Sequence, residues 1–114
     1  MDDRRKNDDN PLNCPVFSTL NLISGKWKPM IIRTLIERPM RFGQIKKRLS
    51  PISQKVLTQQ LRELEKDQVV QREVFEEKVL NVTYSLTHYG RSLIPVLEEL
   101  HEWGNRHFPH FSQR

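Results

Sequence analysis

The chain has 114 residues, which suits one domain with a modest core. Its formal net charge of +5 and its isoelectric point of about 9.7 indicate a polyanionic partner without naming it. The single cysteine, Cys14, excludes a disulfide within the chain and suits a reducing compartment. No apolar run approaches the roughly 18 residues of a membrane span, and the charged N-terminus lacks a signal peptide's apolar core, so we expect a cytoplasmic protein.

The first part of the chain changes character at Cys14. Residues 1–13 carry charges of both signs and almost no apolar side chain, which predicts a flexible N-terminal arm. Helical spacing of apolar residues then predicts a first helix that ends at about Ser24. A second helix is expected to begin near Trp27 and to end before Pro39.

Two further helices follow. Apolar residues at spacing i, i+3 and i+7 predict a short third helix, and they are Phe42, Ile45 and Leu49. Ser53 is a good N-cap for a fourth helix, and Ile52 and Leu57 are placed to form a hydrophobic staple around it. The apolar face of this fourth helix continues to Asp67 through Leu57, Leu61 and Leu64.

The pattern then changes from helical to alternating. Residues 70–75 and 82–87 are predicted to be two antiparallel strands, joined by a connection over residues 76–81. The order of helices followed by a hairpin is typical of the winged helix-turn-helix fold. We therefore expect a mainly α (α+β) domain with a two-stranded wing.

A last helix is expected after the hairpin, capped by Thr87 and kinked by Pro95 near Arg91. The predicted organisation is then an arm, one winged-helix domain over residues 14–107, and a tail over residues 108–114. The last helix carries six large apolar side chains, more than one small domain readily covers, which are Leu93, Ile94, Val96, Leu97, Leu100 and Trp103. This surplus favours a dimer, although all six packing within one monomer is the alternative.

The fourth helix has the composition of a DNA-reading element. If Leu57 is centred on the buried face, a rotation of about 100° per residue places a polar set on the other side. This set comprises Gln54 at its edge, then Lys55, Thr58, Gln59, Arg62 and Lys66. Glutamine can bridge adenine, arginine can bridge guanine, and lysine can meet phosphates. We assign the two lysines to phosphates and the other four to bases.

Positive charge is concentrated around this helix. Residues 26–66 contain 11 basic and 3 acidic residues, a net of 11 − 3 = +8, which exceeds the charge of the whole chain. An ordinary solvated helix face is one alternative, and a non-catalytic winged-helix module that binds a protein or RNA is another. The base-reading residue types favour DNA, since a protein-binding surface would show more exposed apolar side chains.

Four segments of the chain also resemble a known family. They read CPVFSTLNLISGKWKPMIIRTL, RFGQIKKRL, ISQKVLTQQLRELEKDQVV and YSLTHYGRSLIPVLEEL. Together they closely resemble the HxlR-type transcriptional regulators, winged-helix proteins related to the MarR group, from Cys14 to Gly104. The resemblance implies a homodimer, built from the first and last helices, that binds a palindromic operator. It also implies that the helix after Ser53 is the recognition helix.

The DNA-contacting residues expected from the pattern and the resemblance together are Arg41, Ser53, Gln54, Lys55, Thr58, Gln59, Arg62, Lys66, Arg72 and Lys78. The wing departs from a simple fit, because Glu76 and Glu77 lie beside Lys78 at its tip. Two carboxylates repel phosphate, so we expect the tip not to insert deeply and Arg72 or Lys78 to make any contact. In a dimer, two reading helices about 34 Å apart fit successive major grooves.

The sequence allows two interpretations of Cys14. Some HxlR-type members resemble sensors of electrophiles, quinones or oxidants with a cysteine just before the first helix, and Cys14 matches that position. A helix start favours the thiolate, which is compatible with sensing. With no second cysteine, Cys14 could only be alkylated, capped by a small thiol, or joined to Cys14 of the partner chain. The other interpretation is that Cys14 is a structural cysteine of ordinary reactivity.

No other group of residues predicts a metal-binding or catalytic site. His101 and His107 are six residues apart, on different helix faces, and no cysteine or acidic pair completes a metal site with them. Trp27 and Trp103 are expected to be core or interface aromatics. The chain has no Gly-rich phosphate loop, nucleophile elbow or defensible carboxylate pair. We therefore expect no enzyme, no metal and no cofactor.

Overall fold

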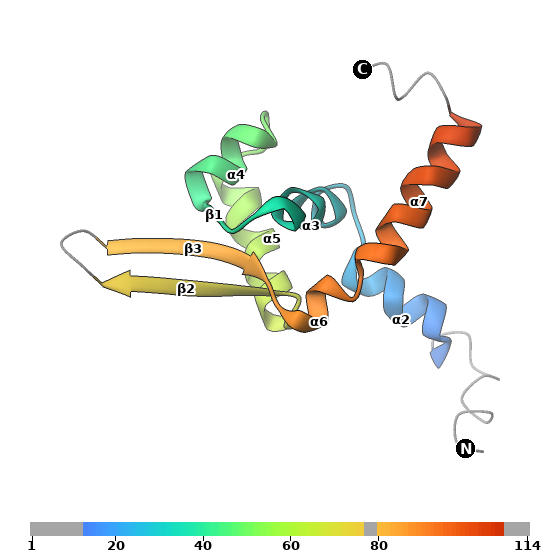
Figure 1. Cartoon of the computed structure of the whole chain (residues 1–114), viewed down its shortest axis with the longest axis horizontal. Coiled ribbons are helices and arrows are strands. Elements are labelled where there is room, and N and C mark those ends of the chain that lie inside the picture. Colours follow the sequence, from blue (N-terminus) through green and yellow to red (C-terminus); the bar gives the residue numbers. More distant parts are fainter. Residues whose placement is uncertain (1–12, 77–79, 109–114) are drawn as a thin grey trace.

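The computed structural model describes residues 13–76 and 80–108 (Figure 1). The predicted arm and tail fall almost wholly outside the described residues, as does Lys78. The elements in chain order are α2 (Pro15–Leu22), α3 (Trp27–Glu37), β1 (Met40–Arg41), α4 (Phe42–Arg48), α5 (Gln54–Lys66), β2 (Val70–Glu76), β3 (Leu80–Leu86), α6 (His88–Arg91) and α7 (Ile94–His107).

The core lies where α3, α4 and α5 meet the base of the sheet. Each helix contributes one apolar stripe, as the helical spacing predicts. The most deeply buried side chains are Ile31, Ile32, Leu35, Met40, Ile45, Leu57, Leu61, Leu64 and Val69. Leu93 and Leu97 join the same cluster from the C-terminal part of the chain. This packing fixes α5 with its opposite face turned outward.

Local signals define both ends of α5. The hydroxyl of Ser53 accepts a hydrogen bond from the Val56 backbone N–H at 3.1 Å, which confirms the predicted N-cap. At the other end Gln68 adopts a left-handed backbone with φ of 64°. The Gln68 and Val69 N–H groups then donate to the carbonyls of Glu65 and Leu64 at 2.9 Å each, which closes the helix.

The hairpin is longer than predicted. Its antiparallel register runs from Val70↔Leu86 to Glu76↔Leu80, so the connection predicted over residues 76–81 is too long. A third strand, β1, pairs with β3 through Met40↔Tyr84 and gives the sheet order β1-β3-β2. Two residues are too short to show an alternating pattern, which is why the sequence did not reveal β1. The helix order, with the hairpin beside α5, confirms the winged helix-turn-helix fold class.

Two helix boundaries differ from prediction. The first helix ends at Leu22, two residues early, and Gly25 follows with φ of 84°. The single kinked C-terminal helix is wrong, because α6 and α7 are separate and Pro95 lies in the first turn of α7. Proline has no N–H to donate to the preceding turn, so it starts a helix more readily than it continues one.

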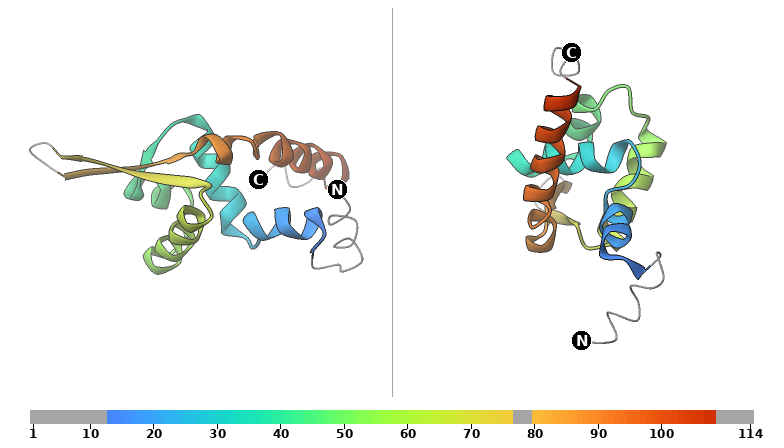
Figure 2. Two further views of the ribbon diagram at one scale, coloured as in Figure 1. Left: turned by 90° about the horizontal axis from the view of Figure 1, so that it is seen from below. Right: turned by 90° about the vertical axis from the view of Figure 1, so that its right-hand side faces the viewer.

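The molecule is extended, with the hairpin at one end and α2 and α7 at the other (Figure 2). Its Cα radius of gyration is 16.5 Å, where a compact domain of about 100 residues has about 13 Å. Three of the six apolar side chains predicted to be in surplus on the last helix remain exposed, namely Val96, Leu100 and Trp103. The exposed apolar residues of α2 are Val16, Phe17 and Leu20. Of these, Val16 and Leu20 line a groove together with Val96 and Leu100 of α7.

Candidate nucleic-acid interface

The residues of α5 that are predicted to contact DNA lie close to one another on its outward face. Leu57, Leu61 and Leu64 are buried on one side of the helix, so the residues between them project away from the core. One open surface is lined by Gln54, Lys55, Thr58, Gln59, Arg62 and Glu63. Most of these side chains are exposed, and Thr58 and Glu63 are half-buried. The face therefore offers amide, hydroxyl and guanidinium groups to an external ligand.

A second depression joins this face to the wing. It is lined by side chains from α4, α5 and the sheet, namely Phe42, Gln54, Thr58, Leu61, Arg62, Glu65, Arg72, Val82 and Tyr84. The Arg72 Nε lies 3.8 Å from the Glu65 Oε2, which links the wing to α5. Both groups retain solvent exposure, so the link adds little to stability. Arg72 and Arg62 line the same depression.

The remaining predicted contact residues lie around this face. Arg41 is exposed just before α4, where its backbone N–H donates to the Gln44 side-chain oxygen at 3.0 Å. Lys66 is exposed in the last turn of α5. The Ser53 hydroxyl already caps α5, so its contribution to a ligand would be made through the helix start. Lys78 lies outside the described residues.

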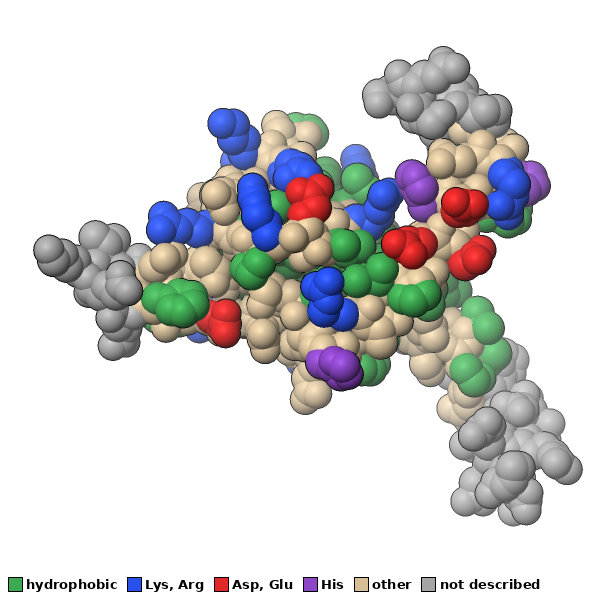
Figure 3. Space-filling view, viewed as in Figure 1, with side chains coloured by type: hydrophobic (Ala, Val, Ile, Leu, Met, Phe, Trp, Pro, Cys, Tyr) green, Lys and Arg blue, Asp and Glu red, His purple; other side chains and the backbone are tan. Residues whose placement is uncertain are grey.

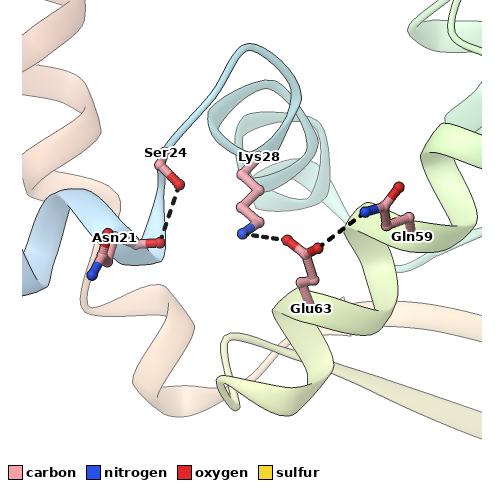
Figure 4. Close-up of polar contacts among 5 residues, drawn as sticks. All are labelled: Asn21, Ser24, Lys28, Gln59 and Glu63. Carbon is pink, nitrogen blue, oxygen red and sulfur yellow. Dashed lines mark hydrogen bonds and ion pairs between the residues drawn. The ribbon is translucent and has the colours of Figure 1, made fainter.

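The structure adds a contact that sequence reasoning missed. Lys28, at the start of α3, is buried, and its Nζ lies 2.7 Å from the Glu63 Oε1 (Figure 4). The other carboxylate oxygen of Glu63 accepts a hydrogen bond of 3.5 Å from the Gln59 Nε2. The hydrogen bond and charge of Lys28 hold the pKa of Glu63 below its usual range, helped by Gln59 and Lys66. Glu63 therefore stays ionised at neutral pH.

One sequence signal could have revealed Lys28. It lies three, four and seven residues before Ile31, Ile32 and Leu35, and so falls on the buried stripe of α3. A lysine on such a stripe needs an acidic partner, because an unpaired buried charge is costly. The partner is 35 positions away in the chain, and only the packing of α3 on α5 identifies it as Glu63.

Charge is divided between the two ends of the molecule. On the face drawn in Figure 3, lysine and arginine side chains gather over α4 and its neighbours, whereas acidic side chains gather on α7. The basic residues of α4 are Lys46, Lys47 and Arg48, and the acidic residues of α7 are Glu98, Glu99 and Glu102. A polyanion would therefore be attracted to the end that carries α4 and α5.

Cys14 is a free, half-buried cysteine at the N-cap position of α2. Its side chain makes no capping hydrogen bond, and its carbonyl accepts one from the Ser18 N–H at 3.1 Å. The residue after it, Pro15, lines an apolar groove between α2 and α7, with Val16, Thr19, Leu20, Ile23, Val96 and Leu100. A chemical change at Cys14 would thus occur beside this groove.

The histidines and tryptophans occupy other positions. The His101 Nδ1 lies 3.0 Å from an Arg33 guanidinium nitrogen, and the His107 ring is stacked on Trp103 at 4.0 Å between centroids. Trp27 packs against the core, as expected, whereas Trp103 is half exposed. Among residues 13–76 and 80–108, no group of three histidine, cysteine or acidic residues is placed to hold a metal ion.

Comparisons with known proteins agree with this geometry. A family model described as HxlR-like helix-turn-helix matches residues 22–112. The chain is 45% identical over 94 residues to an uncharacterised HTH-type transcriptional regulator, YdeP, from Bacillus subtilis (strain 168), covering 82% of this chain and 73% of that protein. The redox regulator HypR in its reduced form has a TM-score of 0.81 at 39% identity, covering 89% and 100% of the two chains. Reduced YodB, a transcriptional regulator from B. subtilis, has a TM-score of 0.75 at 36% identity, covering 82% and 89%.

The fold and the polar face of α5 define a winged helix-turn-helix protein of the MarR-like class. More specifically, the chain belongs to the HxlR-like helix-turn-helix family of transcriptional regulators. Relatives in this family are named as transcriptional regulators. In the described part of the chain, no helix combines the length and apolar character that crossing a bilayer requires.

Proposed function

We propose that the chain is a transcriptional regulator that binds a palindromic double-stranded operator as a homodimer. The observation that carries this proposal is the outward face of α5, where Gln54, Thr58, Gln59 and Arg62 lie together on a helix fixed from behind by three buried leucines. An α-helix fits the major groove, where each base pair presents a distinct pattern of donors and acceptors. Arg72, on the wing, lines the adjoining depression together with Thr58 and Arg62.

The two kinds of contact on α5 should be separable by substitution. Arg62→Ala is expected to relax sequence preference, because a bidentate arginine–guanine contact contributes about 1–3 kcal/mol of discrimination between bases. Lys55→Ala should instead weaken binding to all duplexes similarly and lower the slope of log affinity against log salt by about one. Fluorescence anisotropy on duplexes selected by the wild-type protein from a randomised pool, across a salt titration, measures both quantities.

Identical effects of the two substitutions would contradict this division of roles. If the wild-type protein binds every duplex weakly and alike, the operator-binding proposal itself fails. Specific capture of RNA or of a protein, with no preference among duplexes, would support the alternative of a non-catalytic interaction module.

The homodimer is proposed from the apolar surface at the far end. Val16, Leu20, Val96 and Leu100 are exposed along one groove between α2 and α7, and Trp103 is exposed further along α7. A monomer gains nothing from leaving such a surface in water, whereas a second copy would bury it at roughly 25 cal/mol per Å². Pairing would set two α5 helices at the separation of successive major grooves, about 34 Å.

Cys14 is the proposed sensor of oxidants or electrophiles. HypR is named a redox regulator, and it resembles this chain over nearly its whole length. Cys14 adjoins the groove between α2 and α7, so a group attached to its sulfur would disturb the proposed dimer surface. Two Cys14 thiols from paired chains would lose two protons and two electrons to diamide and form one intermolecular disulfide.

Oxidation is therefore expected to reduce operator affinity through this residue alone. Diamide or a quinone should weaken binding of the wild-type protein about tenfold or more and leave Cys14→Ser unchanged. Gel shift on the selected operator measures the loss, and non-reducing electrophoresis with mass spectrometry identifies the modified sulfur. Equal loss in both proteins would show that Cys14 is a structural cysteine and not the sensor.

A further inference from the structure

Glu63 introduces a negative charge onto the face that is proposed to meet DNA. It lines the same open surface as Gln59 and Arg62, and its side chain is 43% exposed. An unpaired carboxylate at this position would repel the phosphates that approach α5. The ammonium group of Lys28 lies 2.7 Å away and offsets that charge from behind, on the side of α3 (Figure 4).

The same carboxylate constrains Gln59. An ionised carboxylate only accepts hydrogen bonds, so the Gln59 side chain must turn its NH₂ group toward the Glu63 Oε2, 3.5 Å away. The Gln59 carbonyl oxygen and its second N–H then remain free to pair with one base. Adenine requires both an acceptor and a donor at once, and a glutamine with a fixed orientation meets that requirement without losing further side-chain freedom.

From this arrangement we infer that Lys28 is a positioning residue for base reading by Gln59, acting through Glu63. Lys28 is 9% exposed in its side chain and stands behind the reading face, so it would act on DNA only indirectly. Without the ammonium, the Glu63 carboxylate is drawn toward solvent or toward Arg62 and Lys66, and it releases the amide of Gln59. The inference rests on the proposed operator binding and adds a specificity-determining contact to it.

The test compares base preference across a set of full-length variants. The key variants are Lys28→Met and the double variant Lys28→Met with Glu63→Gln, which keeps the net charge of the wild type. Each is used to select duplexes from the randomised pool and is then measured by anisotropy on the wild-type operator. At one base pair of each half-site, both variants are expected to show an affinity ratio between the preferred base and the other bases that is about tenfold lower than that of the wild type. Gln59→Ala should lose its preference at the same base pair. Lys28→Arg, which retains the charge, should keep the preference.

The affinity measurements separate charge masking from base reading. Lys28→Met should also weaken binding to every duplex, most strongly at low salt, because Glu63 is then unmasked. The double variant should recover that general affinity and still lack the preference. Arg106→Met is the matched control, since it removes one positive charge from an ion pair of 3.7 Å on α7 and should change neither property.

Three outcomes would overturn the inference. One is an unaltered base preference in folded Lys28→Met; another is a loss of preference at a different base pair from Gln59→Ala; the third is a further loss at that pair when Lys28→Met is added to Gln59→Ala. If Lys28→Met does not fold, as checked by thermal unfolding, the double variant decides, because replacing both members of an ion pair leaves no buried charge unpaired. A wild-type protein without sequence preference would instead overturn the proposed function.

Discussion

Leu100→Glu is expected to convert the protein to a monomer and to abolish high-affinity operator binding. Leu100 is 54% exposed on α7 and lines the apolar groove shared with α2, which belongs to the proposed dimer surface. Pairing would place two glutamates in an apolar contact, where an unpaired charge costs several kcal/mol. A monomer binds one half-site only and loses the gain from linking two sites, which is about 100-fold or more.

Sedimentation velocity and anisotropy on the full operator measure the two effects of Leu100→Glu. Val74→Glu is the matched control, because Val74 is an aliphatic residue 45% exposed on the wing, away from α2 and α7. It should leave the oligomeric state unchanged. A Leu100→Glu protein that remains dimeric would place the dimer contact elsewhere on the molecule.

Gly90→Ala is expected to have the largest effect on stability. A Cβ on Gly90 would overlap the backbone carbonyl oxygen of Val69, and it would come within 3.0 Å of the Val69 carbonyl carbon and 3.3 Å of the Thr87 Oγ1. Backbone atoms cannot move aside without breaking local hydrogen bonds. The Val69 carbonyl accepts from the Thr87 N–H at 3.1 Å, and the Gly90 N–H donates to Thr87 Oγ1 at 2.8 Å. We expect a loss of about 3 kcal/mol.

A loss of that size should lower the midpoint of thermal unfolding by roughly 10 °C or more, as followed by circular dichroism. Gly43→Ala is the control, since a Cβ there meets nothing within 4 Å and Gly43 lies in a helix, where alanine is the better residue. Its midpoint should be unchanged or slightly higher. Equal stability of Gly90→Ala and wild type would mean that the α6 turn does not pack against Val69 as described.

Local patterns predicted most of the fold because each rests on contacts close in sequence. Ser53 caps α5 through an atom three residues away, and Leu57, Leu61 and Leu64 share a face by helix geometry alone. The incorrect prediction for the last helix also has a physical cause. Pro95 lies in the first turn of a new helix because the chain turns after α6, and sequence gives no direct sign of whether a proline starts a helix or bends one.

The candidate site likewise contains residues that the sequence predicts and contacts that it does not. The polar set on α5 follows from the 3.6-residue period, so its members could be named without coordinates. The proximity of Arg72 to Glu65 and of Lys28 to Glu63 could not, because each pair joins different elements. Whether these residues contact DNA as assigned stays a prediction for the substitutions above.

The amino-acid sequence was enough to predict the four helices before the hairpin, the wing, the concentration of basic residues and the outward row of polar residues on α5. These properties depend on periodicity, capping and composition, which act within a few residues along the chain. The packing of the helices in three dimensions was needed to show that Lys28 is buried against Glu63, that Gly90 packs against a carbonyl, and which apolar side chains on α2 and α7 stay exposed. Those facts depend on which surfaces meet when the helices pack, and that is set by the whole core at once.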